Sequence, residues 1–176
     1  MSKDGFESSG SKERIELLDW INTKQNKPLV LRFELVGLGA KLPNKERDSD
    51  AGIDIYTNIQ EPVCLNPGDG YTFPTGISSE IPEGYAILIR DRSSLGSKLI
   101  GHLAGVIDSE YRGQWKITLI NHGQLPYTVD PGDKICQGIL TKVYDVDIRD
   151  VDKHPEENGS LSNSNRGDKG YGSSGK

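Results

Sequence analysis

Five short apolar segments, each bounded by turn-forming residues, constrain the fold of this chain more than any other feature. The segments are LVLRFELVG (29–37), AGIDIYTNI (51–59), YAILIR (85–90), QWKITLIN (114–121) and KICQGILTKVYDV (134–146). Their Ile, Val, Leu and Tyr content is typical of strands, and the NPGDG, IPEG, NHGQ and DPGD clusters beside them are typical of turns. Because no helical pattern of useful length separates the segments, the sequence predicts an all-β sandwich or barrel.

The residues that precede the first β segment form a region of their own. Ile15, Leu18 and Ile21 recur at helical spacing after Ser11, so a short amphipathic helix is predicted there. Its mixed charges favour packing on the core or on a neighbouring subunit over binding to a membrane surface. Residues 1–27 are therefore interpreted as a partly disordered N-terminal extension that carries this helix.

The other end of the chain changes character after the last β segment. It becomes acidic and then polar through DVDKHPEENGSLSNSN (150–165), which offers too little apolar surface to pack. Residues 151–176 are therefore predicted to be a flexible linker followed by the glycine-rich segment RGDKGYGSSGK (166–176). One β domain is then expected to span residues 28–150.

Composition and charge limit the functions open to a chain of 176 residues with a net charge of −5. The negative balance argues against general nucleic-acid binding, which needs a basic face. No run of eighteen apolar residues exists, and the N-terminus lacks a continuous apolar stretch, so neither a membrane span nor a secretory signal is predicted. Cys64 and Cys136 lie in apolar surroundings and are predicted to be buried thiols of a cytoplasmic, reducing compartment.

The glycine-rich end admits several interpretations. GYGSSG (170–175) matches the G-x-G-x-x-G dinucleotide pattern, but it lacks the strand before it and the helix after it, so that interpretation is rejected. Arg166, Gly167 and Asp168 match an adhesion tripeptide, which is a weak signal by itself. A disordered tail stays open, beside an arm whose backbone N–H groups wrap phosphates while Tyr171 covers a flat ring.

Two stretches in the middle of the chain combine residue types that suit phosphate chemistry. In RDRSSLGSK (90–98), Arg92, Ser93 and Ser94 offer cationic and hydroxyl donors for an anion, although a solvated turn is the simpler interpretation. In AGVIDSEYRGQ (104–114), an apolar run ends at an aspartate, Asp108. Partial desolvation there would raise the basicity of the carboxylate toward that of a general base, but an aspartate that fixes a hairpin turn explains the pattern equally well.

Two further polar residues interrupt apolar segments. Asp54 lies between Ile53 and Ile55, so strand alternation turns it away from both neighbours, either to solvent or into a site. Gln137 interrupts the apolar run that follows the DPGD turn, which suggests a polar pocket, while most of that stretch is interpreted as a structural turn.

Taken together and in order, these stretches resemble the five motifs of the trimeric dUTP diphosphatases, the dUTPases. The matching stretches are DAGIDIY, RSSLG, GVIDSEYRG, PGDKICQ and RGDKGYGSSG, and the resemblance covers residues 29–176. It implies a distorted β jelly roll, a homotrimer with three sites at subunit interfaces, and Mg²⁺-dependent hydrolysis of dUTP to dUMP and diphosphate. That reaction limits uracil incorporation into DNA and supplies dUMP for thymidylate synthesis.

The resemblance also implies a role for individual residues. Asp108 would be the general base for the water that attacks the α-phosphorus, Tyr111 would exclude a 2′-hydroxyl, and Asp54 would bind Mg²⁺ through a water. The other implied substrate contacts are Arg92, Ser93, Ser94 and Gln137 on the phosphate side, His102, Gly105, Val106, Ile107 and Lys116 at the base, and Arg166, Tyr171, Gly172, Ser173 and Ser174 in a closing arm.

The chain departs from the family pattern at three of these positions, and two rival functions stay open. Tyr171 replaces the usual phenylalanine, Ser94 a commoner glycine, and His102 the asparagine of many members. A dCTP deaminase shares the fold and an RSSL stretch, but it carries a catalytic glutamate where this chain has Thr118, so deamination ranks lower. A nucleotide-sensing trimer that signals through residues 1–27 is the second rival, and the complete set of expected catalytic residues weighs against it.

Overall fold

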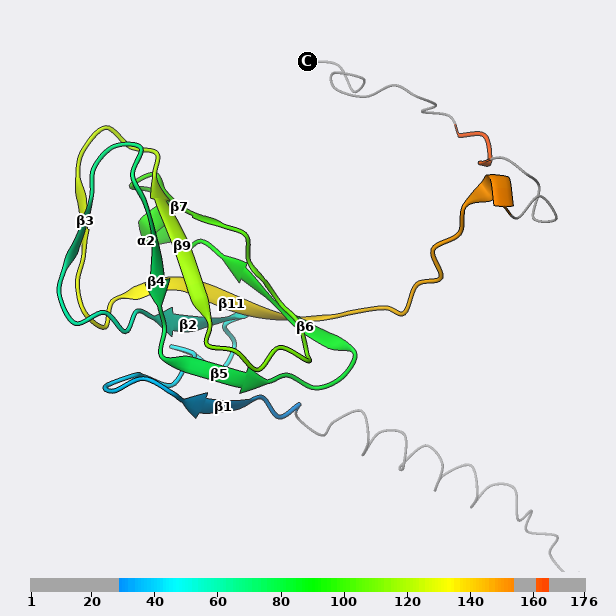
Figure 1. The fold of residues 1–176 in the computed structure, drawn as a ribbon, viewed down its shortest axis with the longest axis horizontal. Coiled ribbons are helices and arrows are strands. Elements are labelled where there is room, and N and C mark those ends of the chain that lie inside the picture. The colour runs from blue at the N-terminus through cyan, green and yellow to red at the C-terminus, as the bar shows by residue number, and fades with distance from the viewer. Residues whose placement is uncertain (1–28, 154–160, 165–176) are drawn as a thin grey trace, which may run out of the picture. The chain divides into compact units, whose positions relative to one another are not determined.

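The computed structural model describes residues 29–153 and 161–164 (Figure 1). The helix expected within residues 1–27 and the glycine-rich segment 166–176 lie outside the described residues. The chain divides into two compact units, Met1–Val143 and Tyr144–Lys176. In the described part, every strand belongs to the first unit, and none of the helices is long and apolar enough to cross a membrane. The strands are β1 (Arg32–Leu35), β2 (Gly52–Tyr56), β3 (Val63–Leu65), β4 (Gly70–Pro74), β5 (Ile77–Glu80), β6 (Tyr85–Arg90), β7 (Ile100–Leu103), β8 (Val106–Ile107), β9 (Lys116–Asn121), β10 (Tyr127–Val129) and β11 (Lys134–Lys142).

Antiparallel pairing organises these strands into four sheets. The largest sheet has the order β2-β11-β6-β8 and the next has the order β4-β9-β7, while β1 pairs with β5 and β10 pairs with β3. Figure 1 shows β4 and β9 running across the direction of β2 and β11. The helical elements of the described residues are a single turn, α2 (Ser93–Gly96), and a 3-10 turn, Val151–Lys153. The predicted all-β fold is confirmed.

Side-chain alternation along the strands builds the core of the first unit. In β9, Ile117 and Leu119 are buried, whereas Lys116 is exposed, as expected for a strand with one face on the core. The indole ring of Trp115 is fully buried and packs edge-on against Phe33, with ring centroids 5.5 Å apart. The predicted segments therefore bury their apolar faces in one cluster to which most strands contribute.

Asn121 is a polar side chain of this core, because it is completely buried at the end of β9. Its Nδ2 donates to the backbone oxygens of Leu65 and Leu125, both at 2.8 Å, and its Oδ1 accepts from the N–H of Gly123 at 2.8 Å. The amide thus ties β9 to β3 and to its own following loop. It satisfies backbone groups that would otherwise be buried without partners.

Replacing Asn121 by Ala is expected to lower the free energy of unfolding by about 3 kcal/mol, because three hydrogen bonds disappear and buried backbone groups lose partners. Urea denaturation measures the change as a lower midpoint at a constant slope. The adjacent exposed residue provides a matched control, and His122→Ala is expected to stay within about 0.5 kcal/mol of the wild type. Equal midpoints for the two variants would contradict this role for Asn121.

The prediction for the two cysteines is half right. Cys136 in β11 is fully buried, and this burial raises the pKa of its thiol. The prediction for Cys64 is wrong, because its side chain is exposed. It is the middle residue of β3, and its neighbours Val63 and Leu65 are the ones that turn toward the core, so alternation turns Cys64 outward.

Candidate functional site

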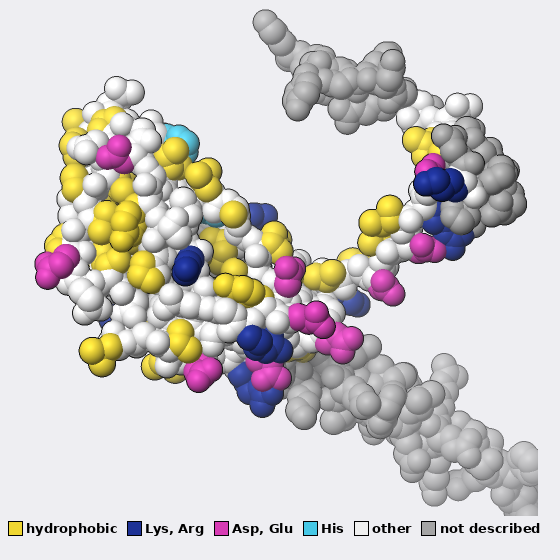
Figure 2. Space-filling view, in the orientation of Figure 1, with side chains coloured by type: hydrophobic (Ala, Val, Ile, Leu, Met, Phe, Trp, Pro, Cys, Tyr) yellow, Lys and Arg dark blue, Asp and Glu magenta, His cyan; other side chains and the backbone are white. Residues whose placement is uncertain are grey.

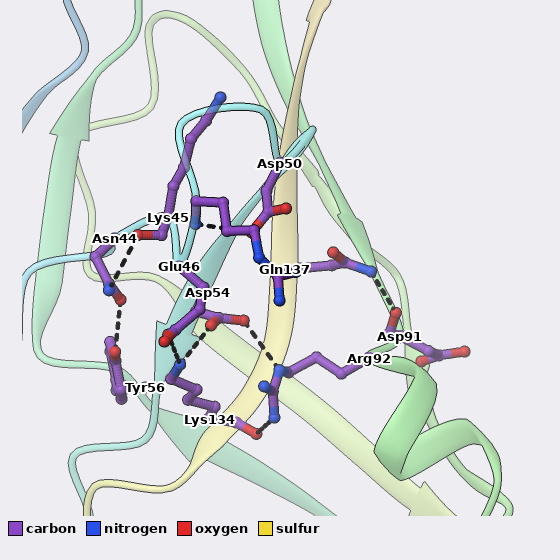
Figure 3. Close-up of polar contacts among 11 residues, drawn as sticks. Asn44, Lys45, Glu46, Asp50, Asp54, Tyr56, Asp91, Arg92, Lys134 and Gln137 are labelled. Carbon is purple, nitrogen blue, oxygen red and sulfur yellow. Dashed lines mark hydrogen bonds and ion pairs between the residues drawn. The ribbon is translucent and has the colours of Figure 1, made fainter.

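Asp54 is the centre of a charged cluster on β2 (Figure 3). Its Oδ1 accepts a hydrogen bond from Arg92 Nε at 2.9 Å, and its Oδ2 lies 2.7 Å from Lys134 Nζ. Only 16% of the Asp54 side chain is exposed, so the two cations hold the carboxylate in a largely desolvated position. The structure thus turns Asp54 away from solvent and into a charged cluster, and its role in a binding site stays a prediction.

Strand register explains why these side chains meet. β11 pairs with β2 so that Gln137 is opposite Asp54 and Lys134 is opposite Tyr56. Residues three apart normally point to opposite faces of a sheet, but a β-bulge between Lys134 and Cys136 inserts one extra residue. Lys134 and Gln137 therefore both lie on the face of Asp54.

Charge in this cluster is shared between several groups. Lys134 Nζ also donates to Glu46 Oε2 at 3.1 Å, and the hydrogen bonds that Lys134 donates to Asp54 and then to Glu46 raise its pKa. Lys134 is therefore a permanent cation at neutral pH. Arg92 Nη1 donates to the backbone oxygen of Lys134 at 3.4 Å, which holds the guanidinium at the start of β11.

A pocket of about 330 Å³ opens beside this cluster. Three cationic side chains, two tyrosines and a serine hydroxyl are among the groups that line it: Arg92, Lys98, Lys134, Tyr56, Tyr127 and Ser94. Lys98 Nζ lies 5.0 Å above the Tyr127 ring, so this ammonium is held by an aromatic face. A guanidinium, two ammonium groups and hydroxyl donors around one cavity are chemically suited to a polyanion such as a chain of phosphates.

A strained turn joins β7 to β8 on the other side of β6. Ala104 has φ of +65° and Gly105 has φ of +121°, a region that favours glycine. A Cβ on Gly105 would come within 3.1 Å of both Ile89 Cβ and His102 Nε2, so only glycine fits there. The Gly105 carbonyl accepts a hydrogen bond from Ile89 N at 2.8 Å, which presses this turn, residues 103–105, against β6.

Asp108 follows β8 directly, and its side chain is exposed. The partial desolvation expected for this carboxylate does not occur in the single chain and would require a ligand or a second subunit. Asp108 O accepts from Tyr111 N at 3.2 Å, so both residues belong to one tight turn, and Tyr111 Oη donates to the Gln114 carbonyl at 3.0 Å. Asp108 and Tyr111, the predicted general base and aromatic residue of the third motif, are therefore held close together.

The other predicted residues lie in four places. Ser93 and Ser94 are exposed on α2 beside Arg92, and Lys116 is exposed at the start of β9. Gln137 reaches toward α2, because its Nε2 donates to the Asp91 carbonyl at 2.8 Å. Val106 and Ile107 form β8, next to the turn at Gly105. The arm residues Arg166, Tyr171, Gly172, Ser173 and Ser174 lie outside the described residues.

Sequence reasoning did not single out two residues that hold the site together. Lys134 lies inside the PGDKICQ stretch, but its approach to Asp54 depends on the bulge, for which the sequence carries no clear signal. Asp91 precedes Arg92, and its carboxylate contacts His102. A charged residue immediately before an arginine that is predicted to bind an anion is the signal that could have drawn attention to it.

Within residues 29–153 and 161–164, no three His, Cys, Asp or Glu side chains converge to hold a metal ion. A carboxylate offers about four lone-pair positions, and the contacts to Arg92 and Lys134 use two of those on Asp54. Asp54 can therefore still accept hydrogen bonds from water molecules on a cation. This fits Mg²⁺, which keeps several waters and is usually bound through substrate phosphates and one or two carboxylates.

Known proteins share both the sequence pattern and the fold. Residues 39–175 match the family model described as dUTPase. The deoxyuridine 5′-triphosphate nucleotidohydrolase of Alcanivorax borkumensis is 38% identical over 145 residues, covering 80% of this chain and 92% of that protein. The protein of the same name from Clostridium tetani is 39% identical over 150 residues, covering 84% of this chain and 97% of that protein.

Solved structures agree with this assignment. The dUTPase of Staphylococcus bacteriophage 80alpha with dUPNHPP is 26% identical, with a TM-score of 0.72, and covers 83% of this chain and 98% of that chain. A mutant dUTPase of phage phi11 of S. aureus, in which a structural Mg(II) ion is coordinated, is 25% identical with a TM-score of 0.64, over 72% of this chain and 99% of that chain. The expected distorted jelly roll is thereby confirmed, and this chain belongs to the dUTPase family.

Proposed function

We propose that this chain hydrolyses dUTP to dUMP and diphosphate with Mg²⁺, through attack of water on the α-phosphorus, and that Asp108 is the general base. The observation that carries the proposal is the convergence of Asp54, Arg92 and Gln137 beside a cationic pocket. The cationic lining of this pocket suits a triphosphate, because several fixed cations can neutralise its negative charge. Membership of the dUTPase family supports the same reaction.

Asp108 supplies the proton acceptor in this proposal. The backbone hydrogen bond from Tyr111 N fixes the turn, while the exposed carboxylate is free to reach a water molecule. Abstracting the proton as the water attacks lowers the barrier by general base catalysis. The Tyr111 ring, anchored through its hydroxyl to the Gln114 carbonyl, would pack on the deoxyribose and leave no room for a 2′-hydroxyl.

The base is proposed to be selected by backbone groups of the turn and of β8. The positive φ at Gly105 brings the main chain of residues 105–107 close to β6, which makes a rigid edge for hydrogen bonds to uracil. A rigid, narrow site rejects the methyl group of thymine by overlap, while an analogue with the wrong hydrogen-bonding groups leaves buried polar groups unpaired. Lys116 and His102 are proposed to complete the base side of the site.

The phosphate side is proposed to be formed by Arg92, Ser93, Ser94 and Gln137. Mg²⁺ would neutralise phosphate charge when bound, and Asp54 would hold one of its water molecules in place. Because Arg92 and Lys134 already fix the Asp54 carboxylate, its oxygens do not need to reorganise when the nucleotide arrives.

A homotrimer is part of the proposal, with phosphate contacts supplied across each interface. Apolar side chains reach the surface at several places over the strands of the first unit (Figure 2). Leu103, the first residue of the turn at 103–105, and Val106, which follows that turn, are 51% and 61% exposed in the single chain, so a second subunit would remove apolar surface from water there. A cytoplasmic location is also proposed, since both cysteines are free thiols.

Diphosphate release from dUTP, dTTP, dCTP and UTP, each with and without Mg²⁺, tests the function. We expect dUTP to exceed the other nucleotides by about 100-fold in kcat/KM, and chelation of Mg²⁺ to abolish most of the rate. Ammonia release from dCTP, measured in parallel, would instead indicate a deaminase. The structure gives no support for that alternative, because Thr118 pairs its hydroxyl with Thr72 at 2.9 Å where a deaminase needs a carboxylate.

A further inference from the structure

We infer that Asp91 and His102 form a positioning pair that locks the turn at residues 103–105 to the phosphate-binding segment. The inference rests on the proposed function, which places that turn against uracil and Arg92 against the phosphates. Asp91 lies between the end of β6 and α2, one residue before Arg92, and His102 lies in β7. The pair therefore connects the four-stranded sheet with the three-stranded sheet at the point where the chain crosses between them.

The Asp91 carboxylate makes two short contacts to one residue. Its Oδ1 accepts from the backbone N–H of His102 at 2.9 Å and lies 2.7 Å from His102 Nδ1. Because an ionised carboxylate only accepts hydrogen bonds, Nδ1 must carry the proton and Nε2 must face the other way. The backbone oxygen of Asp91 meanwhile accepts from Gln137 Nε2, a contact that Figure 3 shows beside Asp54 and Arg92.

The far edge of the His102 ring supports the turn. The space where a Gly105 Cβ would stand is bounded by His102 Nε2 at 3.1 Å and by Ile89 Cβ at 3.1 Å. The His102 side chain is only 13% exposed, so the imidazole fills the gap under the left-handed turn. A small rotation of the ring would therefore move Gly105, and with it β8 and Asp108.

The pair joins the two halves of the proposed site through a short path. The Asp91 carboxylate contacts the His102 ring, which packs against the turn proposed to bind uracil. The Asp91 carbonyl accepts a hydrogen bond from Gln137, and the next residue of the chain is Arg92. The triphosphate and the uracil would then be held at a fixed separation, as in-line attack on the α-phosphorus requires. Asp91 acts only through other residues in this scheme, and His102 acts through the turn in addition to its proposed place on the base side. Their loss should therefore reduce selectivity and positioning more than stability.

Hydrogen exchange of peptides that cover residues 87–107 tests the pair without any substrate. In Asp91→Ala, the amide of Ile89, which donates to Gly105 O, is expected to exchange about tenfold faster, because a charge-assisted hydrogen bond no longer holds the turn. Exchange in β4 and β9 should stay unchanged. Unaltered exchange in residues 87–107 would overturn the inference, independently of the activity that the enzyme shows.

Kinetics on the full chain give the second readout. Asp91→Ala and His102→Leu are each expected to reduce the preference of kcat/KM for dUTP over dTTP about tenfold, and the double variant should lose no more than either single one. His102→Asn should restore most of the preference, since its amide can donate from the position of Nδ1. Full loss in His102→Asn, or strictly additive losses, would contradict a paired role.

The controls separate failure of the pair from failure of the proposed function. Glu80 is likewise a carboxylate in contact with a side-chain nitrogen, that of Arg32, and its side chain has nearly the same exposure as Asp91, so Glu80→Ala should leave both readouts at the wild-type level. If the wild type releases no diphosphate from dUTP, the proposed function is refuted. The hydrogen-exchange experiment would still show whether Asp91 and His102 hold the turn. If the wild type hydrolyses dUTP and Asp91→Ala keeps the full preference for dUTP, the positioning role of Asp91 and His102 is refuted and the proposed function stands.

Discussion

Replacing Asp108 by Asn is expected to lower kcat for dUTP by about 10³-fold, which is the size of effect that a lost general base produces. Asn keeps the size and the hydrogen-bonding geometry of the side chain but does not accept a proton near neutral pH. The backbone hydrogen bond from Tyr111 N to Asp108 O does not involve the carboxylate, so the turn should survive the change. Binding of dUTP should therefore change little, and the loss should appear in kcat rather than in affinity.

Single-turnover hydrolysis and equilibrium binding of a non-hydrolysable dUTP analogue measure the two effects separately. Glu110 is an exposed carboxylate two residues further along the same turn, so Glu110→Gln removes an equal charge from the same neighbourhood. We expect this control to keep its rate within about threefold, since the field of an exposed charge is screened. A comparable loss in both variants would show that the local negative charge matters instead of a base at Asp108.

The strands show which parts of the fold the sequence could predict. The five segments with strong apolar content became β1, β2, β6, β9 and β11. The last four each bury apolar side chains in the core, whereas β1 contributes only the partly buried Phe33. β5 was not predicted, since ISSE has two serines at its centre. Ser78 and Ser79 are nevertheless buried, and Ser79 Oγ accepts from the Trp115 indole N–H at 3.1 Å. A partner 36 residues away satisfies this serine, and no local pattern carries that information.

The candidate site shows the same division between local and long-range information. Alternation was enough to place Asp54 away from the core, because Ile55 beside it is fully buried. The approach of Lys134 could not be predicted, since it depends on one extra residue in β11 and on the register with β2. The exposure of Asp108 was also unexpected, because an apolar run before a carboxylate does not reveal how far β8 extends. Motif resemblance supplied the roles, and strand pairing supplied the contacts.

Ending the chain after Asn165 is expected to lower kcat/KM for dUTP by about 10³-fold while leaving the folded β domain intact. The removed residues include Arg166 and Tyr171, and the resemblance to the dUTPases implies that they contact the γ-phosphate and cover the uracil ring. Their loss would leave the triphosphate open to water and free to leave the geometry of in-line attack, and positioning of this kind accounts for large factors in phosphoryl transfer. All strands of the described residues lie between residues 32 and 142, so the thermal midpoint should not move.

Point variants identify which groups of the arm act. Tyr171→Phe keeps a flat aromatic face and is expected to retain most of the activity, whereas Tyr171→Ala should lose a stacking contact and about tenfold or more in kcat/KM. Arg166→Lys keeps the charge but not the planar fork, so an intermediate loss is expected if bidentate contact with the γ-phosphate matters. A shortened chain with full activity and unchanged dUTP preference would remove the arm from the mechanism. Catalysis would then depend only on the cluster around Asp54 and on the turn that ends at Asp108.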